Sequence, residues 1–249
     1  MFLLATDLDG TFLAGSALYK NQLYRLMLER NDTLLVFVTG RGLASVQSLL
    51  EDPLLPDPAY IIGDVGASIV HGKTLTPVEP IQSGIIQRWP GNEMVLKRLQ
   101  HLPGLVPQQV PQVQRCSFFY GEGTDLQKVH RVAEELGCEV IVSAGKFVDV
   151  LPAGVNKGTT LQQLVNLLGI GHPDVMVAGD TLNDLSLFNT GYNGVVVGAA
   201  EPALLEATRH LPQVYQANSA GCGGIIEAMQ YFDSYRYYLS DVSPSVTRS

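Results

Sequence analysis

Residues 2–11 read Phe-Leu-Leu-Ala-Thr-Asp-Leu-Asp-Gly-Thr, an apolar run followed by two aspartates and a glycine. A similar arrangement recurs far along the chain, where residues 175–178 are apolar and residues 179–184 read Gly-Asp-Thr-Leu-Asn-Asp. Short apolar runs bounded by turn residues are typical of buried strands in a parallel sheet. Carboxylates that follow two such strands can meet at one sheet edge, where α/β folds place their ligands. The two stretches therefore predict a single site for a hard cation and a phosphate.

The composition allows such an enzyme and excludes several other classes. The chain has 249 residues, of which 46% are hydrophobic, and a formal net charge of -8. This length suits one large domain or a core with an insert. The three cysteines lack CxxC spacing, which disfavours a zinc site or a disulfide framework. The acidic balance disfavours nucleic-acid binding, and the lack of a leader or of a run of roughly 18 to 20 apolar residues predicts a cytoplasmic protein without a membrane partner.

The order of strand and helix signals predicts a core domain whose sequence is interrupted by an insert. Strands are expected at residues 2–5, 33–38 and 60–62, with helices at 18–30 and 42–50, and residues 67–73 predict the first arm of a hairpin. The same rhythm resumes with a helix at 157–168, strands at 175–178 and 194–197, and helices at 182–189 and near 202–208. Residues 1–80 and 154–249 are therefore the predicted core. The tail after about Phe232 is expected to be frayed.

The predicted insert, residues 81–153, has a different pattern of strand, helix and turn signals from the core. Proline and glycine punctuate its first part, and a β-prone run at residues 115–120 precedes a helix at 124–136. Two further runs, at 139–142 and 147–151, read as paired strands. The insert is thus expected to be a separate α+β unit.

The two acidic stretches predict the roles of four aspartates. Asp7 is the predicted nucleophile, because a strand-end carboxylate can attack phosphorus and form an aspartyl-phosphate. Asp9 is the predicted acid and then base, placed beside the metal without binding it through its side chain. Mg²⁺ prefers oxygen ligands, so Asp180 is the predicted ligand from the second strand, and Asp184 is either a further ligand or an anchor. The expected metal site therefore comprises Asp7, Asp9, Asp180 and Asp184.

Two other segments offer donors for the phosphoryl group. Thr39, Gly40 and Arg41 follow the second strand, where a hydroxyl and backbone N–H groups can bind an anion at the start of a helix. Thr39 has the simpler alternative role of a helix cap. Lys157 begins a predicted helix and can pair with both the phosphate and Asp7, whereas an isolated lysine there would be solvated.

These motifs, in this order, resemble the four motifs of the haloacid dehalogenase superfamily of Mg²⁺-dependent phosphatases. The insert is similar to the C2-type cap of that superfamily. Residues 143–152, which read Ser-Ala-Gly-Lys-Phe-Val-Asp-Val-Leu-Pro, and residues 156–158, Asn-Lys-Gly, resemble the sucrose-phosphate phosphatases of cyanobacteria and plants. Residues 63–67 and 195–202 are also similar to segments of that family. The resemblance implies a Rossmann-like parallel-sheet core with an inserted α+β cap.

The resemblance also implies Mg²⁺-dependent hydrolysis of sucrose 6-phosphate to sucrose and phosphate. Mannosylfructose phosphate and mannosyl-3-phosphoglycerate are the substrates of close relatives, and the core motifs do not separate these. The implied protein partner is the synthase that makes the sugar phosphate. Phe147 departs from the family, which more often has an acidic or polar residue there. The substrate-binding residues implied are Thr39, Gly40, Arg41, Lys157 and Asn183 in the core and Arg115, Ser117, Lys146 and Asp149 in the insert.

Two other function classes stay open on sequence alone. A phosphotransferase of the same superfamily would move phosphate between sugar positions, and product analysis would distinguish it. A noncatalytic sugar-phosphate-binding domain would have no need of both Asp7 and Asp9.

Overall fold

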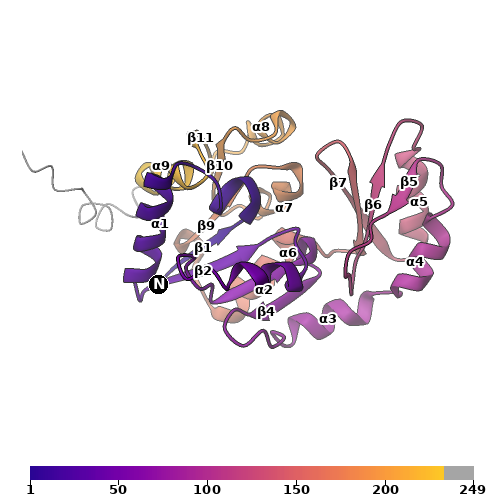
Figure 1. The fold of residues 1–249 in the computed structure, drawn as a ribbon, viewed down its shortest axis with the longest axis horizontal. Coiled ribbons are helices and arrows are strands. Elements are labelled where there is room, and N and C mark those ends of the chain that lie inside the picture. The colour runs from indigo at the N-terminus through magenta and orange to yellow at the C-terminus, as the bar shows by residue number, and fades with distance from the viewer. Residues whose placement is uncertain (233–249) are drawn as a thin grey trace, which may run out of the picture.

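A seven-stranded sheet forms the centre of the core in the computed structural model, which describes residues 1–232 (Figure 1). The strand order is β11-β10-β9-β1-β2-β3-β4, and all neighbours pair in parallel except β3 and β4. This arrangement confirms the predicted α/β fold. The strands are β1 (Phe2–Thr6), β2 (Thr33–Val38), β3 (Tyr60–Gly63), β4 (Ser68–His71), β9 (Val175–Gly179), β10 (Asn193–Gly198) and β11 (Val214–Ala220).

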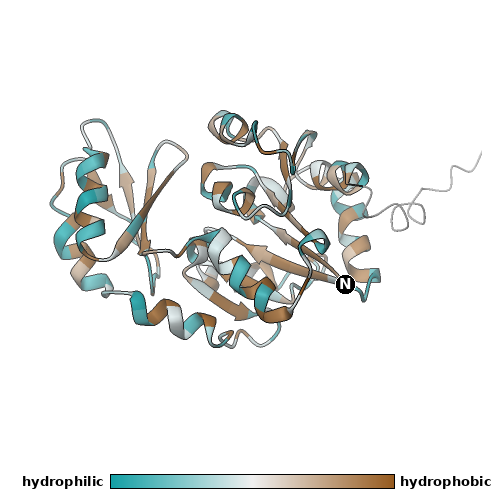
Figure 2. Cartoon of the chain, turned by 180° about the vertical axis from the view of Figure 1, so that it is seen from behind, coloured by the Kyte–Doolittle hydropathy of each residue, from teal (hydrophilic) through white to brown (hydrophobic). Residues whose placement is uncertain are grey.

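Helices cover both faces of this sheet, which explains the unbroken apolar runs of the central strands. Along β1, Leu3 and Ala5 belong to the apolar cluster of one face, while Phe2 and Leu4 belong to the cluster of the other. Figure 2 shows the hydrophobic residues concentrated in the strands. A strand buried on both faces cannot alternate apolar with polar residues. One face carries α1 (Ala17–Glu29), α2 (Leu43–Leu49) and α9 (Cys222–Tyr231), and the other carries α3 (Ile81–Arg88), α6 (Lys157–Leu168), α7 (Leu185–Phe188) and α8 (Pro202–Thr208).

A second, antiparallel sheet forms the cap, by which we mean residues 92–152. Its strands have the order β5-β6-β8-β7, and two helices pack on one face around Phe118, Val148 and Val150. The other face is turned toward the core (Figure 1). These elements are α4 (Asn92–Leu99), β5 (Leu105–Pro107), β6 (Cys116–Tyr120), α5 (Leu126–Glu135), β7 (Cys138–Ser143) and β8 (Phe147–Pro152).

Helix α3, which the sequence assigns to the insert, packs on the core. Ile81 and Ile85 lie in the same apolar cluster as residues of α6. The boundary between the core and the cap therefore lies one helix after residue 81. At the end of α3, the Arg88 guanidinium donates to the Ala153 carbonyl at 3.2 Å, so the two connections between core and cap are tied together.

Several elements differ from the sequence prediction. Helices α3, α4 and α9 and strands β5 and β11 were not predicted. Strand β4 is the second arm of a hairpin with β3, not a first arm, because the turn after it leads only to a single bridge between Val70 and Pro77. The expected helix at 182–189 is a short turn at Leu182–Asp184 followed by α7. No helix within residues 1–232 has the length and apolarity to cross a membrane, and the expected frayed tail lies outside these residues.

Candidate active site

The carboxyl ends of β9, β1 and β2 lie side by side and bring the separate motifs together. Asp7 follows the central strand, Asp180 follows β9, and Thr39 follows β2. The Asp7 backbone N–H donates to the Ala178 carbonyl at 2.9 Å, which extends the β1–β9 pairing to the site. One carboxylate oxygen from each of Asp7, Asp180 and Asp184 lies within 4.8 Å of the others. The expected convergence of the two acidic stretches is present.

Lys157 is the central cation of this cluster, and its side chain is fully buried. Its ammonium donates to Asp7 Oδ1 at 2.8 Å, Asn183 Oδ1 at 2.7 Å and Asp184 Oδ1 at 2.6 Å. Burial would lower the pKa of Lys157, but Asp184 and Asp7 outweigh it and raise the pKa above its usual value. The positive end of a helix disfavours a cation at its first residue, so these acceptors hold Lys157 there against the helix dipole.

The backbone of α6 places this lysine. Asn156 caps the helix by accepting from the Thr159 N–H, and Thr159 bonds back to Asn156, so the first turn is fixed on both sides. Leu161, Leu164 and Val165 anchor the same helix on the sheet. Each such buried side chain contributes about 1.5–3 kcal/mol relative to exposure. The position of Lys157 is thus set by capping and by apolar packing, not by the ion pairs alone.

The three carboxylates are suited to a divalent cation. Burial raises the pKa of Asp180 to about 6, and repulsion from Asp184 adds to the rise. Burial likewise raises the pKa of Asp7; Lys157 opposes this, and Asp184 and Asp180 reinforce it. The cluster therefore has more negative than positive charge, and its ligand atoms are all oxygens, as Mg²⁺ prefers. Gly10 makes room for this arrangement, because a Cβ there would lie 2.1 Å from Asp180 Oδ2.

Asp184 has the contacts of an anchor. Its Oδ1 binds Lys157, and its Oδ2 accepts the backbone N–H groups of Asp180 at 3.0 Å and Thr181 at 3.1 Å. These bonds hold the turn that aims Asp180 at Asp7. Oδ1 keeps a second lone pair, whereas Oδ2 already accepts two N–H groups, so direct metal binding by Asp184 stays a prediction.

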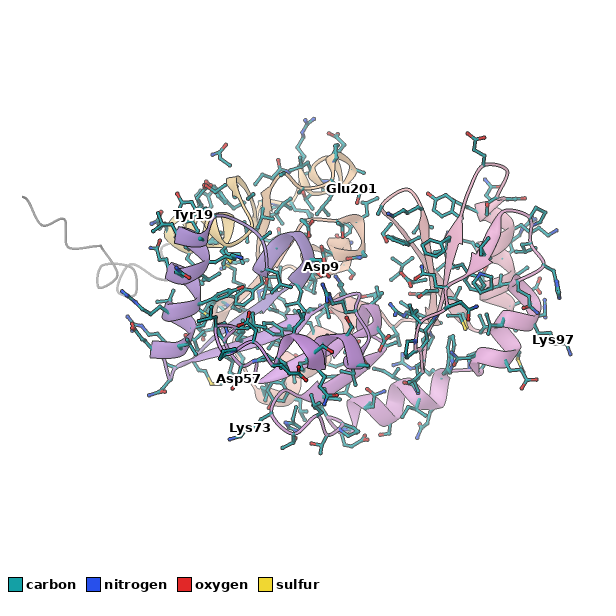
Figure 3. The ribbon with its side chains drawn as sticks, in the orientation of Figure 1. Asp9, Tyr19, Asp57, Lys73, Lys97 and Glu201 are labelled. Carbon is teal, nitrogen blue, oxygen red and sulfur yellow. The ribbon has the colours of Figure 1, made fainter. Side chains whose placement is uncertain are left out.

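Asp9 lies beside the cluster on the side of the core that faces the cap (Figure 3). Its carboxylate is held by Arg41, whose Nε donates to Oδ2 at 2.7 Å and whose Nη2 donates to Oδ1 at 2.6 Å. These bonds lower the pKa of Asp9, against the smaller opposing effect of burial. Asp9 is therefore an ionised base in this conformation.

The segment from Thr39 to Arg41 is a turn and not the first turn of a helix. Helix α2 begins at Leu43 with Gly42 as its cap residue, so the alternative in which Thr39 caps this helix is wrong. Instead the Thr39 hydroxyl accepts from the Arg41 N–H at 3.1 Å. Gly40 and Arg41 line the adjoining cavity, as expected for a phosphate-binding turn.

A cavity of about 800 Å³ separates this edge of the core from the cap sheet. Ser117, Asp149 and Phe147 line it from the cap, and the Ser117 hydroxyl donates a short hydrogen bond to Asp149. Lys146 is not brought into the cavity, because its exposed ammonium lies over the Phe147 ring, 4.8 Å from the ring centre. The core and cap residues that line the cavity include Asp7, Asp9, Gly40, Arg41, Arg115, Ser117, Ser143, Phe147, Asp149 and Asn183.

Three further polar residues support the site and had no role in the sequence prediction. The Thr11 hydroxyl donates to Asp180 Oδ1 at 2.9 Å, and Glu201 Oε2 accepts from the Leu182 N–H at 2.8 Å. Asp64 follows β3 at the same sheet edge and lines the cavity. Thr11 and Asp64 lie in the quoted motifs, so their positions after strands were an available signal. Glu201 lies in the cited segment 195–202, but its contact was not predictable from a local pattern because its partner is 19 residues away.

Comparisons with known proteins agree with this geometry. The sequence profile of the sucrose-6F-phosphate phosphohydrolase family matches residues 1–233. The chain belongs to this family. The match spans both the core and the cap, so all the residues above fall within it.

Members and relatives of the family differ in length and in name. A glucosylglycerol-phosphate synthase from Pseudomonas anguilliseptica is 48% identical over 231 residues, which are 92% of this chain and 30% of that protein. A probable sucrose-phosphatase 3a from Arabidopsis thaliana is 30% identical over 93% of this chain and 59% of that protein. The chain thus spans between about a third and three fifths of these two relatives.

A solved structure shows the same fold throughout. The sucrose-phosphatase from Synechocystis sp. PCC6803, in complex with sucrose and phosphate, superposes with a TM-score of 0.83 at 28% identity. The superposition covers 93% of this chain and 98% of that one. The family fold therefore includes both the parallel core and the cap.

Proposed function

We propose that this chain is a Mg²⁺-dependent phosphomonoester hydrolase that acts on a glycosyl phosphate through an aspartyl-phosphate at Asp7. The observation that carries the proposal is the convergence of Asp7, Asp180, Asp184 and Lys157 at one sheet edge, under a cavity large enough for a sugar phosphate. Family membership supports the same reaction.

The reaction divides between two aspartates. An oxygen of Asp7 attacks phosphorus, the bond from phosphorus to the sugar oxygen breaks, and Asp9 gives a proton to the departing alkoxide. Asp9 then removes a proton from water, which attacks the phosphorus and releases phosphate from Asp7. Lys157, the Thr39 hydroxyl and the Gly40 N–H stabilise charge that develops on the phosphoryl oxygens. Mg²⁺, when bound among Asp7, Asp180 and Asp184, supplies the remaining positive charge.

The Arg41 side chain controls Asp9 in this scheme. In the structure it holds Asp9 through two hydrogen bonds, whereas the first step needs Asp9 protonated. A phosphate bound at the Gly40–Arg41 turn offers the guanidinium a new anionic partner. Once released, Asp9 takes up from solvent the proton that it gives to the alkoxide, so its protonation is coupled to substrate binding.

Two glycosyl phosphates are the leading substrates. Sucrose 6-phosphate is supported by the family and by the similarity to sucrose-phosphatases. Glucosylglycerol phosphate is supported by the higher identity to a protein named as its synthase, and by Phe147, which departs from the family pattern at the cap. We infer that glucosylglycerol phosphate is the better substrate and that a synthase making it is the partner.

Initial rates of phosphate release test this proposal. The panel contains glucosylglycerol phosphate, sucrose 6-phosphate, mannosylfructose phosphate, mannosyl-3-phosphoglycerate and simple hexose phosphates, each with and without Mg²⁺. We expect the highest kcat/KM for glucosylglycerol phosphate. No phosphate release from any member would overturn the hydrolase, and transfer of phosphate to a second sugar position without free phosphate would indicate a phosphotransferase.

A further inference from the structure

Asp64 occupies the fourth position in a row of strand ends. Strands β9, β1, β2 and β3 are neighbours in the sheet, and Asp180, Asp7, Thr39 and Asp64 follow them at the same edge. The first three enter the proposed chemistry. Asp64 does not, although it is buried, with 5% of its surface exposed, and lines the cavity.

The backbone around Asp64 is strained and is bonded to the phosphate-binding turn. Asp64, Val65 and Gly66 have φ values of +51°, +58° and +108°, and the first two are not glycine. Non-glycine residues in this conformation are strained and persist only where surrounding contacts hold them. Here the Asp64 N–H donates to the Arg41 carbonyl at 2.9 Å, and the Val65 N–H donates to the Thr39 carbonyl at 3.1 Å. The strained turn and the phosphate-binding turn are thus one bonded unit.

The same turn also abuts the helix that carries the catalytic lysine. The Thr160 hydroxyl donates to the Gly66 carbonyl at 2.8 Å. A Cβ on Gly66 would lie 2.3 Å from the carbonyl carbon of Asn156, which caps that helix. A displacement of the turn would therefore shift both Thr39 and Lys157.

The cap reaches this unit through one arginine. Arg115 precedes β6 and is 6% exposed. Its Nη2 lies 3.0 Å from Asp64 Oδ1, and its Nη1 donates to the Gly40 carbonyl at 2.7 Å. Nη1 also lies 3.6 Å from Oδ1 of Asp149, the carboxylate expected to meet the sugar. One planar guanidinium thus joins the sugar-facing strand of the cap to both turns of the core, a geometry that a lysine cannot reproduce.

We propose that Asp64 is a positioning residue which, with Arg115, forms a clasp that holds the cap against the phosphate-binding turn. The inference deepens the proposed function and rests on it. A buried ion pair contributes little net stability, because the cost of removing both charges from water offsets their attraction. The clasp therefore leaves opening and closing nearly balanced, and contacts with the sugar decide the position of the cap.

Because of where the clasp lies, a small movement there produces a larger movement of the sugar-binding part of the cap. Cys116, next to Arg115, pairs with Val150 near the connection to the core, and β6 runs from there to Tyr120 at the far end of the sheet. Phe147 lies toward that far end, roughly 10 Å along the strands at about 3.3 Å per residue. A small rotation at the clasp therefore moves Phe147 by a larger distance.

Kinetics of Asp64→Asn, Arg115→Lys and the double variant test the clasp. Asparagine keeps the size of Asp64 and can still accept from the Ser68 hydroxyl, which lies 3.1 Å from Oδ2. Each single variant is expected to raise KM for the best glycosyl phosphate of the panel roughly tenfold to a hundredfold, the range for a lost contact between buried charged groups. The loss with p-nitrophenyl phosphate should be smaller, because this ester does not engage the sugar-binding residues. The double variant should lose no more than the worse single variant.

Small-angle X-ray scattering of the substrate-free variants tests the clasp independently of any activity. We expect a larger radius of gyration and maximum dimension than for the wild type, because the cap is freed from the core. Arg98→Gln is the matched control, since it removes an arginine of the cap whose partner, Glu135, is also in the cap. Unchanged scattering would overturn the clasp, and so would equal losses on both esters or additive losses in the double variant. A wild type that releases no phosphate would refute the proposed function, while the scattering result would still decide the clasp.

Discussion

The core edge and the cap face that enclose the cavity are built on different principles. At the core edge, Lys157 contacts Asp7, Asn183 and Asp184 at once, and each partner follows a buried strand or belongs to a capped turn. On the cap face, Asp149 is held by Ser117 and Arg115, and the neighbouring position along the sheet is apolar Phe147. Both regions bury paired charges, but changes at the core edge act directly on the reacting atoms, whereas Phe147 on the cap face can change without disturbing them.

Replacement of Asp7 is the most severe test of the assignment of chemistry to the core. Asp7→Asn is expected to lower kcat by about a thousandfold or more, because the nucleophilic oxygen is lost. Far-UV circular dichroism should show an unchanged fold, since the two side chains have the same shape. Asp57→Asn, on an exposed position far from the cap in Figure 3, is the control. Phosphate release by Asp7→Asn at the wild-type rate would remove Asp7 from the mechanism.

Removal of divalent cations should abolish turnover on every ester, and added Mg²⁺ should restore it. The pH dependence of stability gives a second measurement. Because the pKa of Asp180 is raised to about 6, its contribution favours the folded state below its unfolded value of 3.8 and is lost as the pH rises through about 6. Bound Mg²⁺ favours the ionised carboxylate, so the increase in Tm on adding Mg²⁺ should be larger at about pH 7.5 than at about pH 5. Equal increases would contradict a role for Asp180 as a ligand.

Loss of Lys157 should damage both stability and activity. Lys157→Ala leaves Asp7 and Asp184 buried without their cation, and we expect the free energy of unfolding to fall by about 3–5 kcal/mol. The rate should fall by about a hundredfold or more. Lys97→Ala, on the exposed outer side of the cap in Figure 3, should change stability by less than about 0.5 kcal/mol. Urea denaturation and initial rates measure the two effects. A Lys157→Ala protein as stable as the control would show that Lys157 does not stabilise the buried carboxylates.

Asp149→Ala tests whether the cap acts on the sugar and not on the phosphate. KM for the best glycosyl phosphate should rise by about tenfold, while the constants for p-nitrophenyl phosphate change little. Glu122→Ala, at an exposed position of the cap between β6 and α5, is the control. Equal losses on both esters would mean that Asp149 supports the core chemistry.

The smallest expected effect concerns Phe147, where the cap departs from the family pattern. Phe147→Glu is expected to raise kcat/KM for sucrose 6-phosphate relative to glucosylglycerol phosphate by about threefold, because one polar contact in a specificity pocket has a modest effect. A change in the opposite direction would show that the ring itself contacts the sugar of sucrose.

The core of the fold was predictable because buried parallel strands have little sequence freedom. The apolar runs at β1, β2 and β9 and the turns after them indicated the sheet and its functional edge. Edge elements such as β11, of which no residue is fully buried, carry a weaker pattern and were missed. Helix α3 was placed with the insert because the proline and glycine signals near it mark turns and do not show which domain a helix packs on.

The motif sequence determined which residues could carry the chemistry, since the strand ends of a parallel sheet gather at one edge whatever the loops between them. Only the tertiary structure decided their contacts. Lys157 and Asp7 are 150 residues apart, and Arg115 and Gly40 are 75 apart, so no local pattern encodes either pair. The structure turned Asp9 toward Arg41, left Lys146 outside the cavity and joined Arg115 to Asp64. Side-chain direction and the angle between two domains depend on packing across the whole chain, which strand periodicity does not specify.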